Sequence, residues 1–472
     1  MDNNNNEKGM IAQLIERART AQTVAQGYSQ EKVDILAAAI AYTLSRSELA
    51  QRIAELAYEE TGMGLIESKY GKLAMKIPAV FFSIKDEKTV GVVEEIKEKN
   101  LIRLAKPVGV IGALIPCTNP EGTPVFNAIC GIRGRNALIF APHPRSKRTT
   151  IEVVNAMREV LKKNDAPEDL LICIKEPSKG VAQELMTQCD LIMATGSGDM
   201  VKAAYSSGKP AYGVGAGNAP IIVDNTVDLS EAAEKIRIGK TGDNASGCSA
   251  ENSLLIQEVI YPKLLEELKK QGGYLLTEQE KQALQKTMWP NGQISIDIVA
   301  KPAAHIAALA GIQVPEETRF LMVEETGVGK EYPFSAEKMS LVLTLYKWRE
   351  FAEAIGLVNK ITRHSGYGHS CGIHSNDKER ILQLALQTST ARVTVRQPHG
   401  VGNGGNWING LAPTFSLGCG TWGGGIASEN ITQKHFLNTT LVSMPLDITI
   451  PDDDAIFGAY LSKIKTIGGT VK

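Results

Sequence analysis

A single cysteine, Cys248, stands in a loop of small residues just before an apolar run. A thiol is strongly nucleophilic once it loses its proton, and small neighbours let an extended ligand approach the sulfur closely. Asp243 and Asn244 lie a few residues before it and add polar groups to the loop. Composition alone favours a buried, inert cysteine. The neighbouring residues nevertheless make Cys248 a candidate nucleophile.

A second candidate site is the tripeptide Gly196-Ser197-Gly198, which follows an apolar run and precedes a predicted helix. Backbone N–H groups at such a helix start can hold a phosphate. The tripeptide is only a fragment of the dinucleotide-binding pattern G-x-G-x-x-G, and a tight strand-to-helix turn is the plainer interpretation. It indicates a nucleotide site only in combination with other motifs.

A basic cluster, Arg145, Lys147 and Arg148, also follows an apolar run and precedes a predicted helix. Cations at this place suit the phosphates of a nucleotide. A solvated basic helix start explains the cluster equally well. Both interpretations stay open at this stage.

The pattern His369-x-Cys371-x-x-His374 brings metal-ligating residue types close together. Its spacing fits no common zinc pattern. We therefore expect no metal site in this chain.

The elements that must position these residues follow from the periodicity of apolar residues. Near the N-terminus, apolar residues recur every three or four positions, which predicts helices over 10–25, 31–44 and 49–59. After Arg103, short apolar runs suited to buried strands alternate with helical stretches. We expect strands at 108–115, 137–140, 170–174, 191–194 and 221–223, and helices at 150–163, 179–188 and 199–206. This alternation predicts a parallel, doubly wound α/β sheet.

A second alternating block begins after Asp224 and predicts a second α/β domain. Its expected helices are 230–239 and 262–271, and its expected strands are 253–259 and 341–346. The segments 89–96 and 100–105 flank a charged turn and resemble a β-hairpin more than core. A projecting hairpin offers an edge to a second subunit.

Composition excludes several classes of protein. The chain has 472 residues, 43% apolar and 22% charged, which is typical of a globular protein of two or three domains. Lys plus Arg number 51 and Asp plus Glu 52, so no net field attracts nucleic acid or an anionic membrane. The seven cysteines form no C-x-x-C pairs, and no stretch resembles a signal peptide or a membrane span. We expect a soluble, cytoplasmic protein with reduced thiols.

Several longer motifs stand in order along the chain. They are Pro116-Cys-Thr-Asn119-Pro, Ala194-Thr-Gly-Ser-Gly198, Gly213-Val-Gly-Ala-Gly-Asn-Ala-Pro220, Cys248 in its loop, and Glu337-Lys-Met-Ser. Their order and spacing resemble the aldehyde dehydrogenase superfamily over nearly the whole chain. Three more motifs are Ala141-Pro-His-Pro-Arg-Ser-Lys147, the segment 203–213, and Leu417-Gly-Cys-Gly-Thr-Trp-Gly423 followed by Ser428-Glu-Asn430. They are similar to the coenzyme A-acylating branch, which includes enzymes for succinate semialdehyde and sulfoacetaldehyde and the aldehyde half of bifunctional alcohol/aldehyde dehydrogenases.

The resemblance implies a fold and a set of roles. The fold is a Rossmann-like cofactor domain and a catalytic domain, both doubly wound α/β, with a β-hairpin oligomerisation flap. Cys248 attacks the aldehyde carbon, and the Asn119 amide and the Cys248 backbone N–H stabilise the oxyanion. Glu337 matches the carboxylate that holds the nicotinamide ribose. The implied cofactor-binding residues are Pro142, His143, Arg145, Thr195, Gly196, Ser197, Gly198, Gly217 and Glu337.

The fate of the resulting thioester separates the branches of the family. Hydrolytic members carry a Glu in a Glu-Leu-Gly-Gly motif that activates water, and Val214 occupies that position here. A thiol attacks a thioester far more readily than unactivated water does. The chain is therefore predicted to transfer the acyl group to CoA, reversibly, from an aldehyde or an acyl-CoA. The alternatives are an acetaldehyde- or butyraldehyde-type acylating enzyme, a hydrolytic aldehyde dehydrogenase, and a non-catalytic scaffold.

The identity of the substrate and of the nicotinamide cofactor is less constrained. NAD and NADP both stay open, because Ala141 replaces the Lys of the family's Lys-Pro-Ser-Glu motif. Arg396 stands where relatives usually have Asn, so we hypothesise that Arg396, with His399, pairs with an anionic tail on the aldehyde. An exposed or structurally paired arginine is the alternative.

The expected domains are interlocked. Residues 1–88 and 106–228 form the dinucleotide-binding domain, and 229–428 form the catalytic domain. Residues 89–105 and 429–472, including a strand at 437–444, form the oligomerisation flap and C-terminal arm. By resemblance, the protein is a homodimer or homotetramer.

Overall fold

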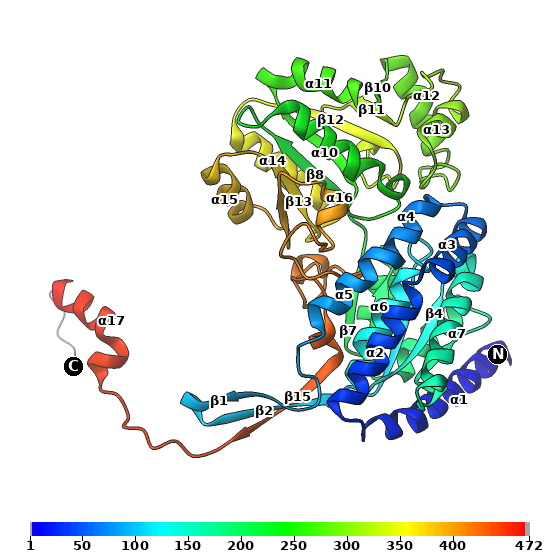
Figure 1. The fold of residues 1–472 in the computed structure, drawn as a ribbon. Helices are drawn as coiled ribbons and strands as arrows, with labels where there is room; N and C mark the ends of the chain where they lie inside the picture. Colours follow the sequence, from blue (N-terminus) through cyan, green and yellow to red (C-terminus); the bar gives the residue numbers. More distant parts are fainter. Residues whose placement is uncertain (1, 468–472) are drawn as a thin grey trace.

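Helices open the chain, as the spacing of apolar residues predicts. The computed structural model describes residues 2–467 (Figure 1). The first helices are α1 (Asp2–Ala25), α2 (Gln30–Leu44), α3 (Ser47–Thr61), α4 (Ile66–Gly71) and α5 (Ile77–Ile84), with a π-helical turn, η1 (Lys72–Lys76), between the last two. The buried residues of α2 recur every three or four positions, from Val33 to Leu44. Helix α1 packs on the first sheet, and α2 to α5 pack on the helices that cover this sheet or on one another.

The first sheet has five parallel strands in the order β5-β4-β3-β6-β7. Its strands are β3 (Val110–Ile115), β4 (Ala137–Pro142), β5 (Leu171–Cys173), β6 (Leu191–Thr195) and β7 (Ala211–Val214). The crossover helices are α6 (Gly122–Arg133), α7 (Lys147–Lys163), α8 (Lys179–Gln188) and α9 (Gly198–Tyr205). Every residue of β3 and β4 is buried, which explains their uninterrupted apolar sequence.

The second sheet has seven parallel strands in the order β10-β11-β12-β9-β8-β13-β14. Its strands are β8 (Ala219–Val223), β9 (Glu251–Gln257), β10 (Gly273–Leu275), β11 (Phe320–Glu324), β12 (Val342–Trp348), β13 (Cys371–His374) and β14 (Val393–Val395). The helices of this half are α10 (Leu229–Thr241), α11 (Tyr261–Lys270), α12 (Glu278–Met288), α13 (Ala303–Leu309), α14 (Phe351–His364), α15 (Lys378–Gln387) and α16 (His399–Gly402). The predicted fold class, two parallel α/β halves, is confirmed.

The chain passes from one sheet to the other earlier than expected. Strand β8 pairs with β9 and β13, so it belongs to the second sheet, although the expected boundary near residue 228 places it in the first. Val214 is the last strand residue of the first sheet. A short apolar run has the same sequence whichever sheet it joins, since its hydrogen-bond partners are distant in the chain. The domain ranges themselves stay a prediction.

The predicted hairpin is present and gains a third strand from the C-terminal region. Strands β1 (Gly91–Ile96), β2 (Leu101–Pro107) and β15 (Leu437–Ser443) form an antiparallel sheet in the order β1-β2-β15. This ribbon projects from the first half, and α17 (Asp453–Ile467) lies beyond its far end (Figure 1). In residues 2–467, no helix is long and apolar enough to cross a membrane.

Candidate active site

The second sheet brings Cys248 and His369 together. Cys248 lies shortly before β9 and His369 shortly before β13, and both strands run parallel to β8 between them. The amino ends of parallel strands lie at the same edge of a sheet, so these residues meet although 121 positions separate them. His369 Nε2 lies 3.2 Å from Cys248 Sγ. The sequence interpretation considered His369 only as a metal ligand, and its position before a neighbouring strand is the signal that would have found it.

The protonation of this pair follows from its surroundings. Burial raises the pKa of Cys248 to about 12, and the nearby carboxyl group of Glu337 acts in the same direction. Burial holds the pKa of His369 well below its ordinary value, and the charge of Arg392 lowers it further. The resting pair is therefore a neutral thiol beside a neutral imidazole. His369 is placed to accept the thiol proton when the sulfur attacks an electrophile.

A buried polar network fixes the two residues. Arg392 donates to the His369 carbonyl at 2.8 Å and to Asn403 Oδ1 at 3.1 Å. Asn403 Nδ2 donates to Ser249 Oγ at 2.8 Å and to Ser370 Oγ at 3.0 Å, and Ser370 Oγ lies 2.7 Å from His369 Nδ1. Asn403 thus contacts the residue after Cys248 and the residue after His369, which sets their relative position.

Asn119 lies in the turn between β3 and α6, at the carboxyl edge of the first sheet, and is half-buried. Lys72 connects this turn to the loop that precedes Cys248. Its Nζ donates to the carbonyl of Thr118 at 3.4 Å and to Asp243 Oδ2 at 2.6 Å, and it lies 3.2 Å from Glu121. The ammonium group of Lys72 therefore contacts both the turn that carries Asn119 and the loop that precedes Cys248. The role of Asn119 as an oxyanion donor stays a prediction.

The residues expected to bind the cofactor lie along the same edge of the first sheet. Pro142 ends β4 and Thr195 ends β6, on either side of β3. His143 Nδ1 accepts from the Arg145 backbone N–H at 3.1 Å, which fixes the turn after β4. Arg145 in turn donates to the carbonyl of Thr61 at 3.4 Å.

The tripeptide at residues 196–198 forms a helix start, as its sequence suggests. Ser197 is the N-cap of α9, and its Oγ accepts from the Met200 N–H at 3.4 Å. An added Cβ on Gly198 would meet no atom within 4 Å, so the helix start faces open space that can admit a phosphate. Thr195 Oγ1 lies 3.3 Å from Ser416 Oγ.

Gly217 and Glu337 lie directly beside Cys248. Gly217 donates its backbone N–H to Glu337 Oε1 at 2.8 Å, and burial raises the pKa of Glu337 to about 8. A Cβ on Gly217 would collide with the Cys248 carbonyl oxygen, so only glycine permits this approach. Cys248, Gly217 and Glu337 line one cavity together with Asn218 and Lys240.

Comparisons with known proteins show the family of this chain. The model of the aldehyde dehydrogenase family matches residues 3–284. This chain belongs to the aldehyde dehydrogenase family. It is 44% identical to a sulfoacetaldehyde dehydrogenase from Acholeplasma sp. over 98% of this chain and 96% of the relative. It is 38% identical to the acetylating succinate-semialdehyde dehydrogenase of Clostridium kluyveri over 95% and 99% of the two chains.

Solved structures of family members superpose on the chain. An acetylating aldehyde dehydrogenase from Geobacillus thermoglucosidasius matches with a TM-score of 0.91 and 37% identity, over 95% of this chain and 99% of that one. A propionaldehyde dehydrogenase from Rhodopseudomonas palustris, solved with bound propionyl-CoA, matches with a TM-score of 0.82 and 28% identity, over 92% and 94%.

Val214 occupies the position at which a hydrolytic member of this family is expected to carry a carboxylate. It ends β7 and is only 3% exposed. The position expected to carry a hydrolytic carboxylate therefore holds a buried aliphatic side chain. An aliphatic side chain cannot deprotonate water.

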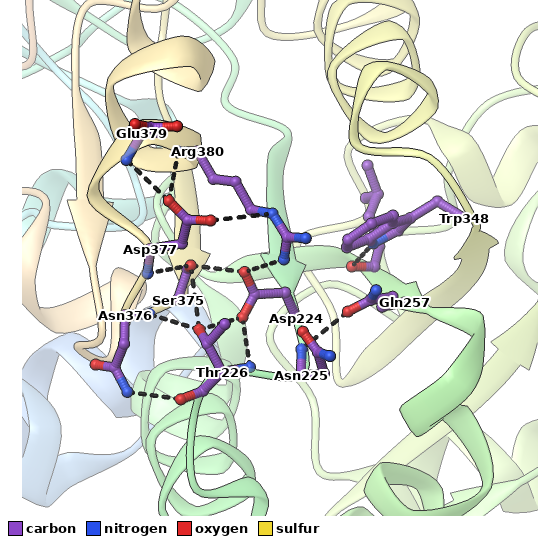
Figure 2. Close-up of polar contacts among 11 residues, drawn as sticks. Asp224, Asn225, Thr226, Gln257, Trp348, Ser375, Asn376, Asp377, Glu379 and Arg380 are labelled. Carbon is purple, nitrogen blue, oxygen red and sulfur yellow. Dashed lines mark hydrogen bonds and ion pairs between the residues drawn. The ribbon is translucent and has the colours of Figure 1, made fainter.

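The structure places Arg396 away from the thiol. Arg396 follows the carboxyl end of β14, whereas Cys248 lies at the amino edge of the same parallel sheet. Its exposed guanidinium donates to Asn376 Oδ1. Figure 2 shows Asn376 in a group of polar residues with Asp224, which follows the carboxyl end of β8, and Arg380, which lies on α15. Arg396 is thus a paired arginine, as the alternative interpretation expected, and its contact with the aldehyde's tail stays a prediction.

His399 is buried, and its expected role toward the substrate stays a prediction. Its backbone N–H donates to Glu251 Oε1 at 2.7 Å, and its charge, if protonated, would lower the pKa of His369. In residues 2–467, no group of three or more His, Cys, Asp or Glu side chains could hold a metal ion. His369 faces Cys248, while Cys371 Sγ lies 3.5 Å from Thr390 Oγ1.

Proposed function

We propose that the protein is a CoA-acylating aldehyde dehydrogenase. It converts an aldehyde, CoA and NAD(P)+ to an acyl-CoA and NAD(P)H, and the reaction is reversible. The observation that carries this proposal is the contact of Cys248 Sγ with His369 Nε2 at 3.2 Å, in a chain whose buried Val214 stands where a hydrolytic base is expected. The relatives named above as acetylating, and the one solved with propionyl-CoA, support the same chemistry.

The residues of the site act in sequence. His369 accepts the proton of Cys248 as the sulfur attacks the aldehyde carbon. The side-chain amide of Asn119 and the backbone N–H of Cys248 stabilise the thiohemiacetal oxygen, each donor contributing about 3 kcal/mol. When bound, NAD(P)+ accepts the hydride and CoA accepts the acyl group. His369, protonated in the first step, is placed to return its proton to the Cys248 thiolate when the acyl group leaves for CoA. The proton of the CoA thiol is then released, so the oxidation of one aldehyde yields one H+.

Two features fit a nicotinamide dinucleotide. The start of α9 faces open space, and the buried carboxyl group of Glu337 lies next to Cys248. Glu337 would hold the nicotinamide ribose. The rest of the dinucleotide and CoA would be held by residues 195–198 together with Pro142, His143 and Arg145. The reductase assay described below distinguishes NAD from NADP. The β1-β2-β15 ribbon is the proposed contact between the subunits of a homodimer or homotetramer. The proposed location of the protein is the cytoplasm.

The test is NAD(P)H formation from aldehydes with and without CoA. We expect acyl-CoA with CoA present and a negligible rate without it. Release of free carboxylic acid at full rate without CoA would instead identify a hydrolytic enzyme. The reverse assay, reduction of acyl-CoA with NADH or NADPH, gives the cofactor preference.

A further inference from the structure

A second lysine on the π-helical turn η1 faces the site from the side of helices α4 and α5. Lys76 Nζ lies 4.7 Å from the centre of the Phe415 ring. It would also lie 2.8 Å from a Cβ on Gly404, so the absent side chain at this glycine leaves room for the ammonium group. Phe415 packs against Gly122, the first residue of α6, just after the turn that carries Asn119.

These neighbours place Lys76 in the wall of the active site. Gly404 follows Asn403, which hydrogen-bonds to the residues after Cys248 and His369. Cys248 is also close enough to act electrostatically on Lys76. Lys76 is not among the residues that line the cavity shared by Cys248 and Glu337.

The charge of Lys76 is not neutralised by the protein. In the described part of the chain, Lys72 pairs with Asp243 and Glu121, but no carboxylate lies within ion-pair distance of Lys76. Its contact is the face of an aromatic ring, which attracts a cation but leaves its N–H donors available. A half-buried ammonium group without a counter-ion favours an anion in the space it faces.

We propose that Lys76 determines substrate specificity by binding an anionic group, a sulfonate or a carboxylate, at the far end of a short aldehyde whose carbonyl carbon meets Cys248. This inference rests on the proposed function and assigns the substrate's tail to a residue. It gives Lys76 the contact that Arg396 was expected to make.

The experiment compares kcat/KM for sulfoacetaldehyde, succinate semialdehyde and propanal in the CoA-dependent assay. Wild-type protein should prefer one of the anionic aldehydes. In the Lys76→Met variant, kcat/KM for that aldehyde should fall roughly tenfold to hundredfold, the size of one lost charged hydrogen bond, mainly through KM. Propanal should change less than about threefold, since it has no group for the ammonium to bind.

Two further variants sharpen the comparison. Lys76→Arg keeps the charge and should retain part of the preference for the anion. Lys85→Met removes an exposed lysine that pairs with Asp86 and should leave all three values unchanged. The preferred anionic aldehyde identifies the sulfonate or the carboxylate as the natural group.

Several outcomes would overturn the inference. Equal losses on propanal and on the anionic aldehydes would show that Lys76 supports the thiol or the fold. If kcat/KM of Lys76→Met for the anionic aldehydes were unchanged, or if the wild-type protein preferred propanal, Lys76 would not bind the tail of the substrate. Absence of CoA-dependent activity with every aldehyde would refute the proposed function itself, and this inference with it.

Discussion

The Nζ atom of Lys72 lies 2.6 Å from a carboxylate oxygen of Asp243, 171 positions away in the sequence. Asp243 and the two residues after it all have positive φ angles, between 49° and 58°, which non-glycine residues rarely adopt. Asp243 also accepts from the Leu65 N–H and from Ser246 Oγ. The ion pair therefore holds a strained loop that leads into the nucleophile.

Lys72→Met should lower the thermal midpoint clearly, because it leaves the carboxylate of Asp243 buried without its partner. Breaking such a pair costs about 3–5 kcal/mol. The control is Lys147→Met, whose exposed pair with Glu176 should contribute less than about 1 kcal/mol. Calorimetry of both variants is the measurement, and equal midpoints would show that the pair is not structural.

Acid stability gives an independent check of the same ion pair. Burial raises the pKa of Asp243, but Lys72 and the other nearby groups hold it below its ordinary value. The contribution of this group is thus complete above the unfolded-state pKa of Asp and disappears as the pH falls through the lower folded-state pKa. Lys72→Met should lose less stability than wild type between about pH 5 and pH 3.

Cys248→Ser should abolish CoA-dependent aldehyde oxidation, by at least roughly 10³-fold, because a serine hydroxyl is a much weaker nucleophile beside the same imidazole. The measurement is NAD(P)H formation at saturating CoA. Cys173→Ser, in the partly buried β5, is the matched control and should keep its activity. Turnover that survived in the serine variant would exclude Cys248 as the nucleophile.

His369→Gln should reduce kcat/KM by roughly 10²–10⁴-fold at neutral pH, as expected for a lost general base. Because the pKa of Cys248 is raised to about 12, the variant's thiolate fraction should still rise about tenfold per pH unit. Its kcat/KM should therefore recover steeply between about pH 7 and pH 9. His305→Gln, at an exposed position, is the control. Parallel pH profiles for wild type and variant would exclude proton transfer to His369.

Gly217→Ala should reduce activity by roughly 10²-fold, because the added methyl group would displace the Cys248 backbone. Gly215→Ala is a matched control, since a Cβ there would meet no atom within 4 Å. Rates of Cys248 alkylation by iodoacetamide, followed by peptide mass spectrometry, would report the displacement directly. Equal kinetics for the two variants would contradict the close approach of Gly217.

The preference for anionic aldehydes should decline as the pH rises through about 8. Burial and the neighbouring charge of Lys72 lower the pKa of Lys76 to about 8, against a smaller opposite effect of Cys248, so its ammonium group is lost above that pH. Dividing kcat/KM for the anionic aldehyde by kcat/KM for propanal cancels the pH dependence of the steps that both substrates share. In Lys76→Arg the ratio should stay flat, because guanidinium does not titrate in this range.

The local features of this protein could be predicted from its amino-acid sequence. Uninterrupted apolar runs predicted the buried parallel strands, and helical spacing predicted the first helices. The small residues around Cys248 made it a candidate nucleophile, a role that the family resemblance then implied. Motif order identified the family, and Val214 indicated the fate of the thioester. Apart from the order of the motifs, each of these signals lies within one short segment of the sequence.

The tertiary structure decided which distant side chains meet. His369 reaches Cys248 because two parallel strands begin at one edge of a sheet, while Arg396, with suitable chemistry, follows a strand at the opposite edge. Lys76 gave no sequence signal, because a lysine on a helical segment has the same local pattern whether it faces solvent or an aromatic ring. Strand order and helix packing are set by long-range burial and hydrogen bonding, and these depend on partners that no local pattern specifies.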